Sequence, residues 1–152
     1  MITWLNNKFG TTYTEETLSE IKNFTLLWSI YENLIFNNSF SIGRLETEIN
    51  IRDIRFRDYA DIFTYFQGRY TENGSVNNRF QYLSFRPNDR ETFVRDVLLG
   101  QIQDNNSKIL AIGIIIYRFR NNLFHGLKDI TQLHGQIDNF IFANNYLKRF
   151  IN

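Results

Sequence analysis

The amino-acid sequence predicts an all-α protein, an up-and-down helical bundle of four to five main helices. Apolar residues recur at spacings of three and four along nearly the whole chain, which is the pattern of helices with one buried face. No segment alternates between apolar and polar residues with the period of two that indicates a β-strand. A length of 152 residues suits one domain and leaves little for a second, so we expect a single domain over residues 1–152.

The first long helix is expected from Tyr13 to Phe36. Thr12 and Glu15 have the spacing of a capping box, in which two side chains bind each other's backbone N–H groups. The polar residues 37–39 end this helix. Its buried face is expected to comprise Leu18, Ile21, Thr25, Trp28, Tyr31 and Ile35.

Two more helices are expected before residue 71. A short helix runs from Ser41 to Ile49, and the next is capped by Asn50 and Asp53. Residues 72–75, with the sequence Glu-Asn-Gly-Ser, then form a break. The apolar side of the second helix comprises Ile51, Ile54, Tyr59, Ile62, Phe63, Phe66 and Tyr70.

The pattern is weaker in the middle of the chain. Residues 76–86 predict only a short helical turn at Phe80–Leu83. After the single proline, Asn88 and Glu91 are expected to cap a helix that reaches Ile102.

The last third of the chain predicts two helices. The most apolar helix is expected over Lys108–Phe124, with Gly126 just past its last turn, where a C-terminal glycine is common. Asp129 and Gln132 then cap a helix that continues to the end of the chain.

Composition and charge narrow the possible functions. The absence of cysteine excludes a disulfide scaffold, a thiol nucleophile and a thiolate metal site. A net charge of +1 lacks the positive field of a general duplex-DNA binder, so no DNA partner is expected. The longest apolar run, Ile109–Tyr117, is far shorter than the roughly 20 residues that cross a bilayer, and the first ten residues lack a signal-peptide pattern. We therefore expect a cytoplasmic protein that does not associate with a membrane.

Few residues of the chain could support catalysis. It has two histidines, His125 and His134, and neither belongs to a zinc-binding motif. No glycine-rich phosphate loop, serine-nucleophile motif or paired Glu-x-x-His motif is present, so neither a metal nor a cofactor is expected. His134 has no matched neighbour and is not expected to be catalytic.

A cluster of arginine, asparagine and histidine closes the most apolar helix, in the sequence Arg-Phe-Arg-Asn-Asn-Leu-Phe-His-Gly over residues 118–126. At about 100° per residue, Asn121 lies about 100° and His125 about 140° from Arg120, so the three share one side of the helix end, away from its core face. A guanidinium can hold a phosphate oxygen, and an imidazole can give or take a proton near neutral pH. The asparagine could orient the imidazole or bind a substrate oxygen. This set suits cleavage of RNA, because the 2′-hydroxyl of RNA supplies the nucleophile and the protein has only to position groups and move protons.

The pattern Arg-Asn-x-x-x-His at a helix end, followed by glycine and one last helix, resembles the signature of the HEPN superfamily. These are small α-helical bundles of toxin–antitoxin, abortive-infection and CRISPR-associated systems. The resemblance covers about a dozen residues and implies a HEPN-like fold and a metal-independent endoribonuclease. By position it implies that Arg120, Asn121 and His125 are catalytic, and we expect Arg118, Asn122, Tyr117 and Lys128 to contact the RNA.

This resemblance also bears on protein partners. It implies that an antitoxin or inhibitor protein is a possible partner. One toxin subgroup carries a tyrosine two residues after the histidine, which a partner nucleotidyltransferase modifies. Leu127 occupies that position here, which argues against regulation by that route.

The most apolar helix also carries a second stripe. Leu110, Ile114 and Tyr117 lie opposite its core face, and the same line continues into Asn121 and His125. An exposed apolar stripe is a liability on a monomer, so a symmetric homodimer through this stripe would explain it and would bring two motifs into one cleft. Alternatively, the helix is central and surrounded within the bundle.

Two other functional interpretations stay open. A non-catalytic bundle could bind a nucleotide in the Arg-Asn-His pocket or dock a partner protein through the stripe. The chain could also be a structural helical domain without a pocket, in which His125 only interacts with the dipole at the helix end. Binding without cleavage would favour the first interpretation, and an Arg120→Ala variant that changes stability alone would favour the second.

Overall fold

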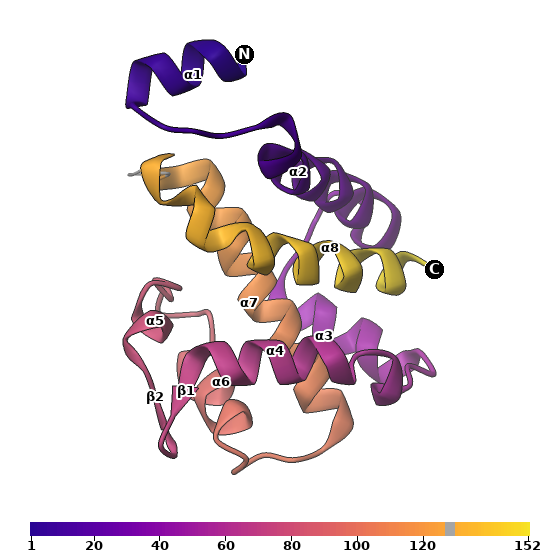
Figure 1. The fold of residues 1–152 in the computed structure, drawn as a ribbon. Helices are drawn as coiled ribbons and strands as arrows, with labels where there is room; N and C mark the ends of the chain where they lie inside the picture. The colour runs from indigo at the N-terminus through magenta and orange to yellow at the C-terminus, as the bar shows by residue number, and fades with distance from the viewer. Residues whose placement is uncertain (127–129) are drawn as a thin grey trace.

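The computed structural model describes the backbone of residues 1–126 and 130–152, and the side chains of residues 1–123 and 131–152. The described chain is mostly helical, which confirms the all-α prediction (Figure 1). Its α-helices are α1 (Ile2–Phe9), α2 (Glu15–Phe36), α3 (Ile42–Ile51), α4 (Ala60–Tyr70), α5 (Asn78–Gln81), α6 (Glu91–Leu98), α7 (Asn105–Gly126) and α8 (Ile137–Ile151). The 3₁₀ helices η1 (Phe56–Asp58) and η2 (Ile130–Gln136) and the short strands β1 (Thr71–Glu72) and β2 (Ser75–Val76) complete it.

The helices in the first half begin and end at other residues than predicted. Thr14, and not Thr12, caps α2, because its hydroxyl accepts a hydrogen bond of 3.1 Å from the backbone N–H of Thr17. Asn50 lies inside α3 and caps nothing, since α3 continues to Ile51 before the chain becomes extended. The expected capping by Asn50 and Asp53 is therefore wrong, and the next helix begins only after η1.

The helices in the second half differ from the prediction in similar ways. Helix α6 is preceded by Arg90, in a left-handed conformation, and not by Asn88 as its cap. It ends before Gly100, whose φ is +78°. Helix α7 begins three residues earlier than predicted, because the carboxylate of Asp104 accepts a hydrogen bond from the N–H of Ser107 at 3.0 Å. The last helix begins later than predicted, after η2, and Asp129, its predicted cap, lies outside the described residues.

Helix α1, the 3₁₀ helix η1 and the β1–β2 hairpin were not predicted. Helix α1 precedes the first expected helix, and β1 pairs antiparallel with β2 across the segment read as a plain break. Asn73 and Gly74 connect the strands with φ of +52° and +78°, as a two-residue type I′ turn requires.

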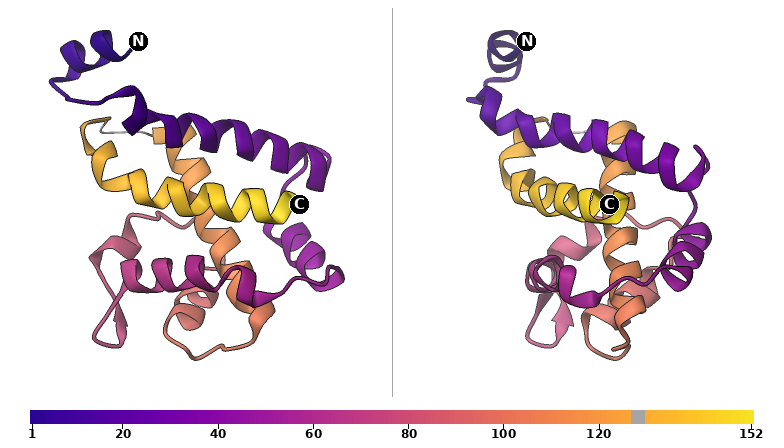
Figure 2. Two further views of the ribbon diagram at one scale, coloured as in Figure 1. Left: turned by 45° about the vertical axis from the view of Figure 1, so that its right-hand side comes forward. Right: turned by 90° about the vertical axis from the view of Figure 1, so that its right-hand side faces the viewer.

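The helices do not form a simple up-and-down bundle. Helices α2 and α8 lie side by side and run in the same direction, whereas α7 crosses them steeply (Figures 1 and 2). Ring pairs support the parallel arrangement, because the Phe24–Phe140 and Tyr31–Phe150 contacts, with centroids 5.2 and 5.5 Å apart, advance together along both helices. The predicted up-and-down order is thus wrong, since α2 and α8 run parallel to each other and α7 crosses both of them.

Helix α7 occupies the middle of the main hydrophobic core and packs against α3, α4 and α6. Gly113, at its centre, permits the closest approach: a Cβ atom there would lie 2.5 Å from Leu45 Cδ2 and 2.7 Å from Tyr146 Oη. No helix in the described residues is both long enough and apolar enough to span a membrane.

Candidate functional site

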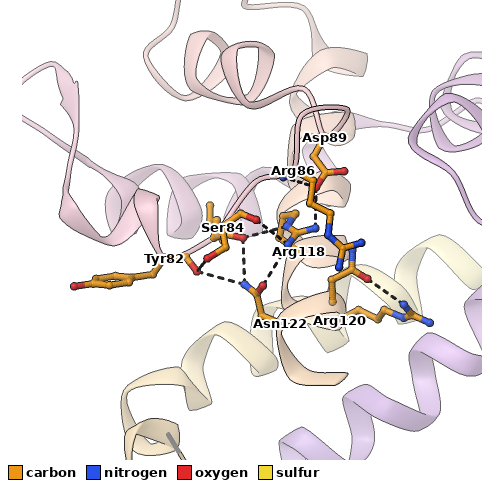
Figure 3. A network of polar contacts seen from close by, with 9 residues as sticks. Tyr82, Ser84, Arg86, Asp89, Arg118, Arg120 and Asn122 are labelled. Carbon is orange, nitrogen blue, oxygen red and sulfur yellow. Dashed lines mark hydrogen bonds and ion pairs between the residues drawn. The ribbon is translucent and has the colours of Figure 1, made fainter. Parts of the chain in front are cut away.

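The predicted site residues belong to the last turns of α7, which the surrounding helices hold in place. The side chains of Tyr117, Arg118, Arg120, Asn121 and Asn122 are described. Figure 3 shows the polar contacts around Arg118, Arg120 and Asn122. The side chain of His125 and the whole of Lys128 lie outside the described residues, so their predicted roles stay predictions.

Arg118 is buried and forms an internal ion pair. Its guanidinium donates to the Asp89 carboxylate at 2.7 Å, to the carbonyl oxygens of Leu83 and Ser84 at 3.1 and 2.8 Å, and to the Asn122 side chain at 3.3 Å. Burial lowers the pKa of Arg118, and the Asp89 carboxylate opposes this shift. With 2% of its surface exposed, Arg118 cannot reach a substrate. The expectation that Arg118 binds RNA is therefore wrong, and the residue instead joins α7 to the segment after α5.

Asn122 strengthens the same connection. Its amide donates to the carbonyl oxygens of Tyr82 and Leu83 at 3.3 and 3.2 Å (Figure 3). Unlike Arg118, Asn122 is partly exposed and lines a cavity. It is therefore held by its backbone acceptors and still accessible to a ligand.

Arg120 and Asn121 form a second polar unit on α7. Arg120 points to the other side of the helix from Arg118 and Asn122 (Figure 3). Its Nη1 donates to the Asn121 side-chain oxygen at 3.0 Å, although the two residues are neighbours in sequence. Arg120 is partly exposed, whereas Asn121 is 2% exposed. Two of the three predicted catalytic residues are thus in direct contact.

The environment of Asn121 differs from the prediction. We expected it on an outward face, but it is buried, because other helices surround α7 almost to its end. Its Nδ2 atom is buried and has no hydrogen-bond partner in the part of the chain that the structure describes. Leaving a buried donor unbound costs about 1–3 kcal/mol. Asn121 is as buried as Arg118, so it can act on a substrate only through Arg120.

The predicted apolar stripe of α7 does not form an exposed surface. Leu110 and Ile114 are buried in the main core, and the ring of Tyr117 packs on Phe40 and Trp28, with centroids 4.8 and 6.1 Å apart. The expectation of an exposed stripe is wrong, and the alternative of a central, surrounded helix is confirmed. A homodimer stays a prediction, but this stripe no longer supports it. Tyr117 is partly exposed and packs against the core, so its predicted contact with RNA stays a prediction.

A cavity of about 260 Å³ lies beside α7, on the side that Asn122 faces. Its walls come from α4, η2, α7, α8 and the α5 region, and they include Arg69 and Arg79. Sequence reasoning missed both arginines, because nothing in the local pattern links them to a motif about 40–50 residues further along the chain. Only the packing of α4 and α5 against the end of α7 brings them there.

Comparison with protein-family models, with curated proteins and with solved structures gives no match for this chain. Within the described residues, no group of three or more histidine and carboxylate side chains is placed to share a metal ion. The functional interpretation therefore depends on the motif and its surroundings.

Proposed function

We propose that this protein is a metal-independent endoribonuclease of the HEPN type, acting in the cytoplasm in a toxin–antitoxin or antiphage defence system. The observation that carries the proposal is the contact between Arg120 and Asn121 at the end of α7, with His125 in the last turn of the same helix. The motif that resembles HEPN nucleases thus includes an arginine whose guanidinium is oriented by the next residue.

In the proposed reaction, the 2′-hydroxyl oxygen of RNA attacks the adjacent phosphorus and loses its proton to a base. The bond from phosphorus to the 5′-oxygen breaks, and that oxygen receives a proton as it leaves. His125 is proposed to transfer protons, and Arg120 to stabilise the negative charge that grows on the phosphate oxygens. The products are a 2′,3′-cyclic phosphate and a free 5′-hydroxyl.

The internal contacts of Arg118 and Asn122 support this proposal indirectly. They bind the last turns of α7 to residues 82–89 through five hydrogen bonds. A helix end held in this way limits the movement of Arg120 and Asn121. Catalytic groups need such support, because a misplacement of about 1 Å can cost roughly 100-fold in rate.

Cleavage of a labelled RNA tests the proposal. We expect His125→Ala and Arg120→Ala to lower the rate by about 10²–10⁴-fold while the circular dichroism spectrum and the urea midpoint stay near those of the wild type. EDTA should leave the rate unchanged, and RNA with 2′-O-methyl groups should resist cleavage. His134→Ala and Arg55→Ala are matched controls, since both residues are exposed and neither belongs to the motif.

Two results would overturn the proposal: cleavage at the wild-type rate by a folded His125→Ala protein, or its abolition by EDTA. Expression of the wild-type and His125→Ala chains in the same host provides a second measurement, in which only the wild type should arrest growth.

A further inference from the structure

The cavity beside α7 has walls suited to an anion that carries a planar ring. Its floor is apolar and includes the buried side chains of Tyr70, Leu83, Phe119 and Phe140. Amide side chains and two guanidinium groups stand above this floor. No carboxylate is among the described residues that line it, so the charge of the arginines is not neutralised within the cavity.

Arg69 provides a cation at this cavity, and only some of its N–H groups have acceptors in the described part of the chain. Its Nη2 donates to the Gly135 carbonyl oxygen at 3.0 Å, which fixes the guanidinium, but its Nε is buried without a hydrogen-bond partner in the described part of the chain. Arg69 also forms no ion pair with any described residue. A buried donor on a charged group is costly to leave unbound, so an acceptor from a ligand would be favourable here.

Arg79 provides the second cation and is exposed. Its side chain makes no hydrogen bond or ion pair to the described residues, so it is available to a ligand. Burial raises the pKa of Tyr70, and the positive charges of Arg69 and Arg79 oppose this rise, which places the field of both guanidiniums at the cavity wall. Two guanidiniums of this kind are well suited to phosphate oxygens.

The remaining polar groups suit the edge of a nucleobase. Asn122, Gln132 and Gln136 each carry an amide that can donate and accept hydrogen bonds. Tyr82 stands at the rim with 71% of its surface exposed, and Figure 3 shows its ring extending away from the network around Arg118. Exposed aromatic rings at such sites stack on unpaired bases. The volume of about 260 Å³ has room for one ring system with its sugar but not for a dinucleotide.

We propose that this cavity binds one nucleotide, with the phosphate at Arg69 and Arg79 and the base between the amide side chains and the apolar floor. Asn122, which lines this cavity, points to the other side of α7 from Arg120 (Figure 3), and neither Arg120 nor Asn121 is among the lining residues. The assignment of that nucleotide to an RNA strand rests on the proposed function, whereas the cavity chemistry is argued from its own residues. In an RNA strand, the nucleotide would be an unpaired one outside the cleaved step, and the cavity would select it.

Two matched pairs of variants test this binding site. Arg79→Gln removes a cation from the cavity, and Arg55→Gln makes the same charge change at an exposed arginine without side-chain partners among the described residues. Gln132→Glu replaces an amide of the cavity with a carboxylate of the same size. Gln101→Glu makes the same replacement at an exposed glutamine outside the cavity. All four positions are exposed, so we expect every variant to fold.

Binding is measured with two probes: the four ribonucleoside monophosphates by calorimetry, and a short single-stranded 2′-O-methyl RNA by fluorescence anisotropy. The second probe lacks the reacting hydroxyl, so cleavage does not interfere. We expect Arg79→Gln and Gln132→Glu each to weaken binding by about tenfold or more, and the two controls by less than about twofold. If the oligomer binds with this dependence on Arg79 and Gln132 and the monophosphates do not bind, the site takes a nucleotide of an RNA strand. If the monophosphates bind with the same dependence, the site takes a free nucleotide.

The proposal is overturned if neither probe binds, or if the cavity variants and their controls lose affinity equally. Cleavage of unmodified RNA by the same variants separates this outcome from failure of the proposed function. Cleavage that depends on His125, combined with binding that ignores Arg79 and Gln132, overturns only the cavity. Binding that depends on Arg79 and Gln132 in a chain that cleaves nothing overturns only the nuclease.

Discussion

Replacement of Asp89 with asparagine should destabilise this protein strongly, because it leaves the charge of Arg118 buried without a counter-ion. The two side chains are 9% and 3% exposed and lie 2.7 Å apart. The same Asp89 oxygen also accepts a hydrogen bond from the backbone N–H of Arg86 at 2.9 Å. Removing one partner of a buried pair costs about 3–5 kcal/mol, a large part of the roughly 5–15 kcal/mol that stabilises a typical domain.

Urea denaturation followed by tryptophan fluorescence measures this loss. With a slope of about 2 kcal/mol per molar urea, the midpoint should fall by about 2 M. Asp61→Asn is the matched control, because the Asp61–Arg149 pair has the same 2.7 Å separation but side chains that are 53% and 38% exposed. An exposed pair contributes only about 0–1 kcal/mol. Equal losses in the two variants would refute the view that burial makes the Arg118 pair essential.

Two further predictions concern α7 itself. Gly113→Ala should lower the free energy of unfolding by about 1–2 kcal/mol. Alanine favours a helix over glycine by roughly 1 kcal/mol, but its Cβ would overlap with the buried side chains of Leu45 and Tyr146, and this cost is larger. A variant more stable than the wild type would contradict the close packing. Asp104→Ala should cost about 0.5–1 kcal/mol at pH 7, since the carboxylate caps the N–H of Ser107. The hydrogen bonds from Ser107 lower the pKa of Asp104 in the folded protein below its ordinary value of 3.8. The stabilisation by Asp104 is therefore fully present above pH 3.8 and is lost as the pH falls through the folded-state pKa. Stability curves of wild type and variant that stay parallel down to about pH 2 would contradict this prediction.

The helical character of the chain could be predicted from the sequence because it follows from local spacing. Trp28, Tyr31, Ile62 and Phe66 are buried in the main core as expected. Thr25 and Ile51, which were expected on buried faces, are exposed, and Phe24 is buried although it was not expected to be. The ends of helices were less predictable, because several polar residues compete for each cap. Thr12 and Thr14 both precede α2, and only the backbone conformation decides between them.

The hairpin at residues 71–76 was missed although its turn was visible. Asn73 and Gly74 favour a type I′ turn, but the strands on either side have two residues each, too few to show an alternating pattern. A search for Asn-Gly turns independent of strand length would have found it.

The surroundings of the motif could not be predicted from spacing. Helical spacing within α7 could not show that Asp89 and two backbone carbonyl groups lie inside the protein as partners of Arg118. The apolar stripe through Ile114 was misread for the same reason. Two apolar faces on one helix fit a dimer and a central helix equally well, and the choice depends on helices distant in the sequence.

The pairing of α2 with α8 has a consequence for how the chain acquires its structure. Asn144 of α8 donates to the carbonyl and the carboxylate of Glu20 in α2, across 124 positions of sequence. During synthesis, α2 is made long before α8, so the aromatic residues of α2 that pack against α8 stay unpacked until the end of the chain is made. Closing so long a loop is entropically costly, so we expect the pairing of α2 with α8 to form late in folding.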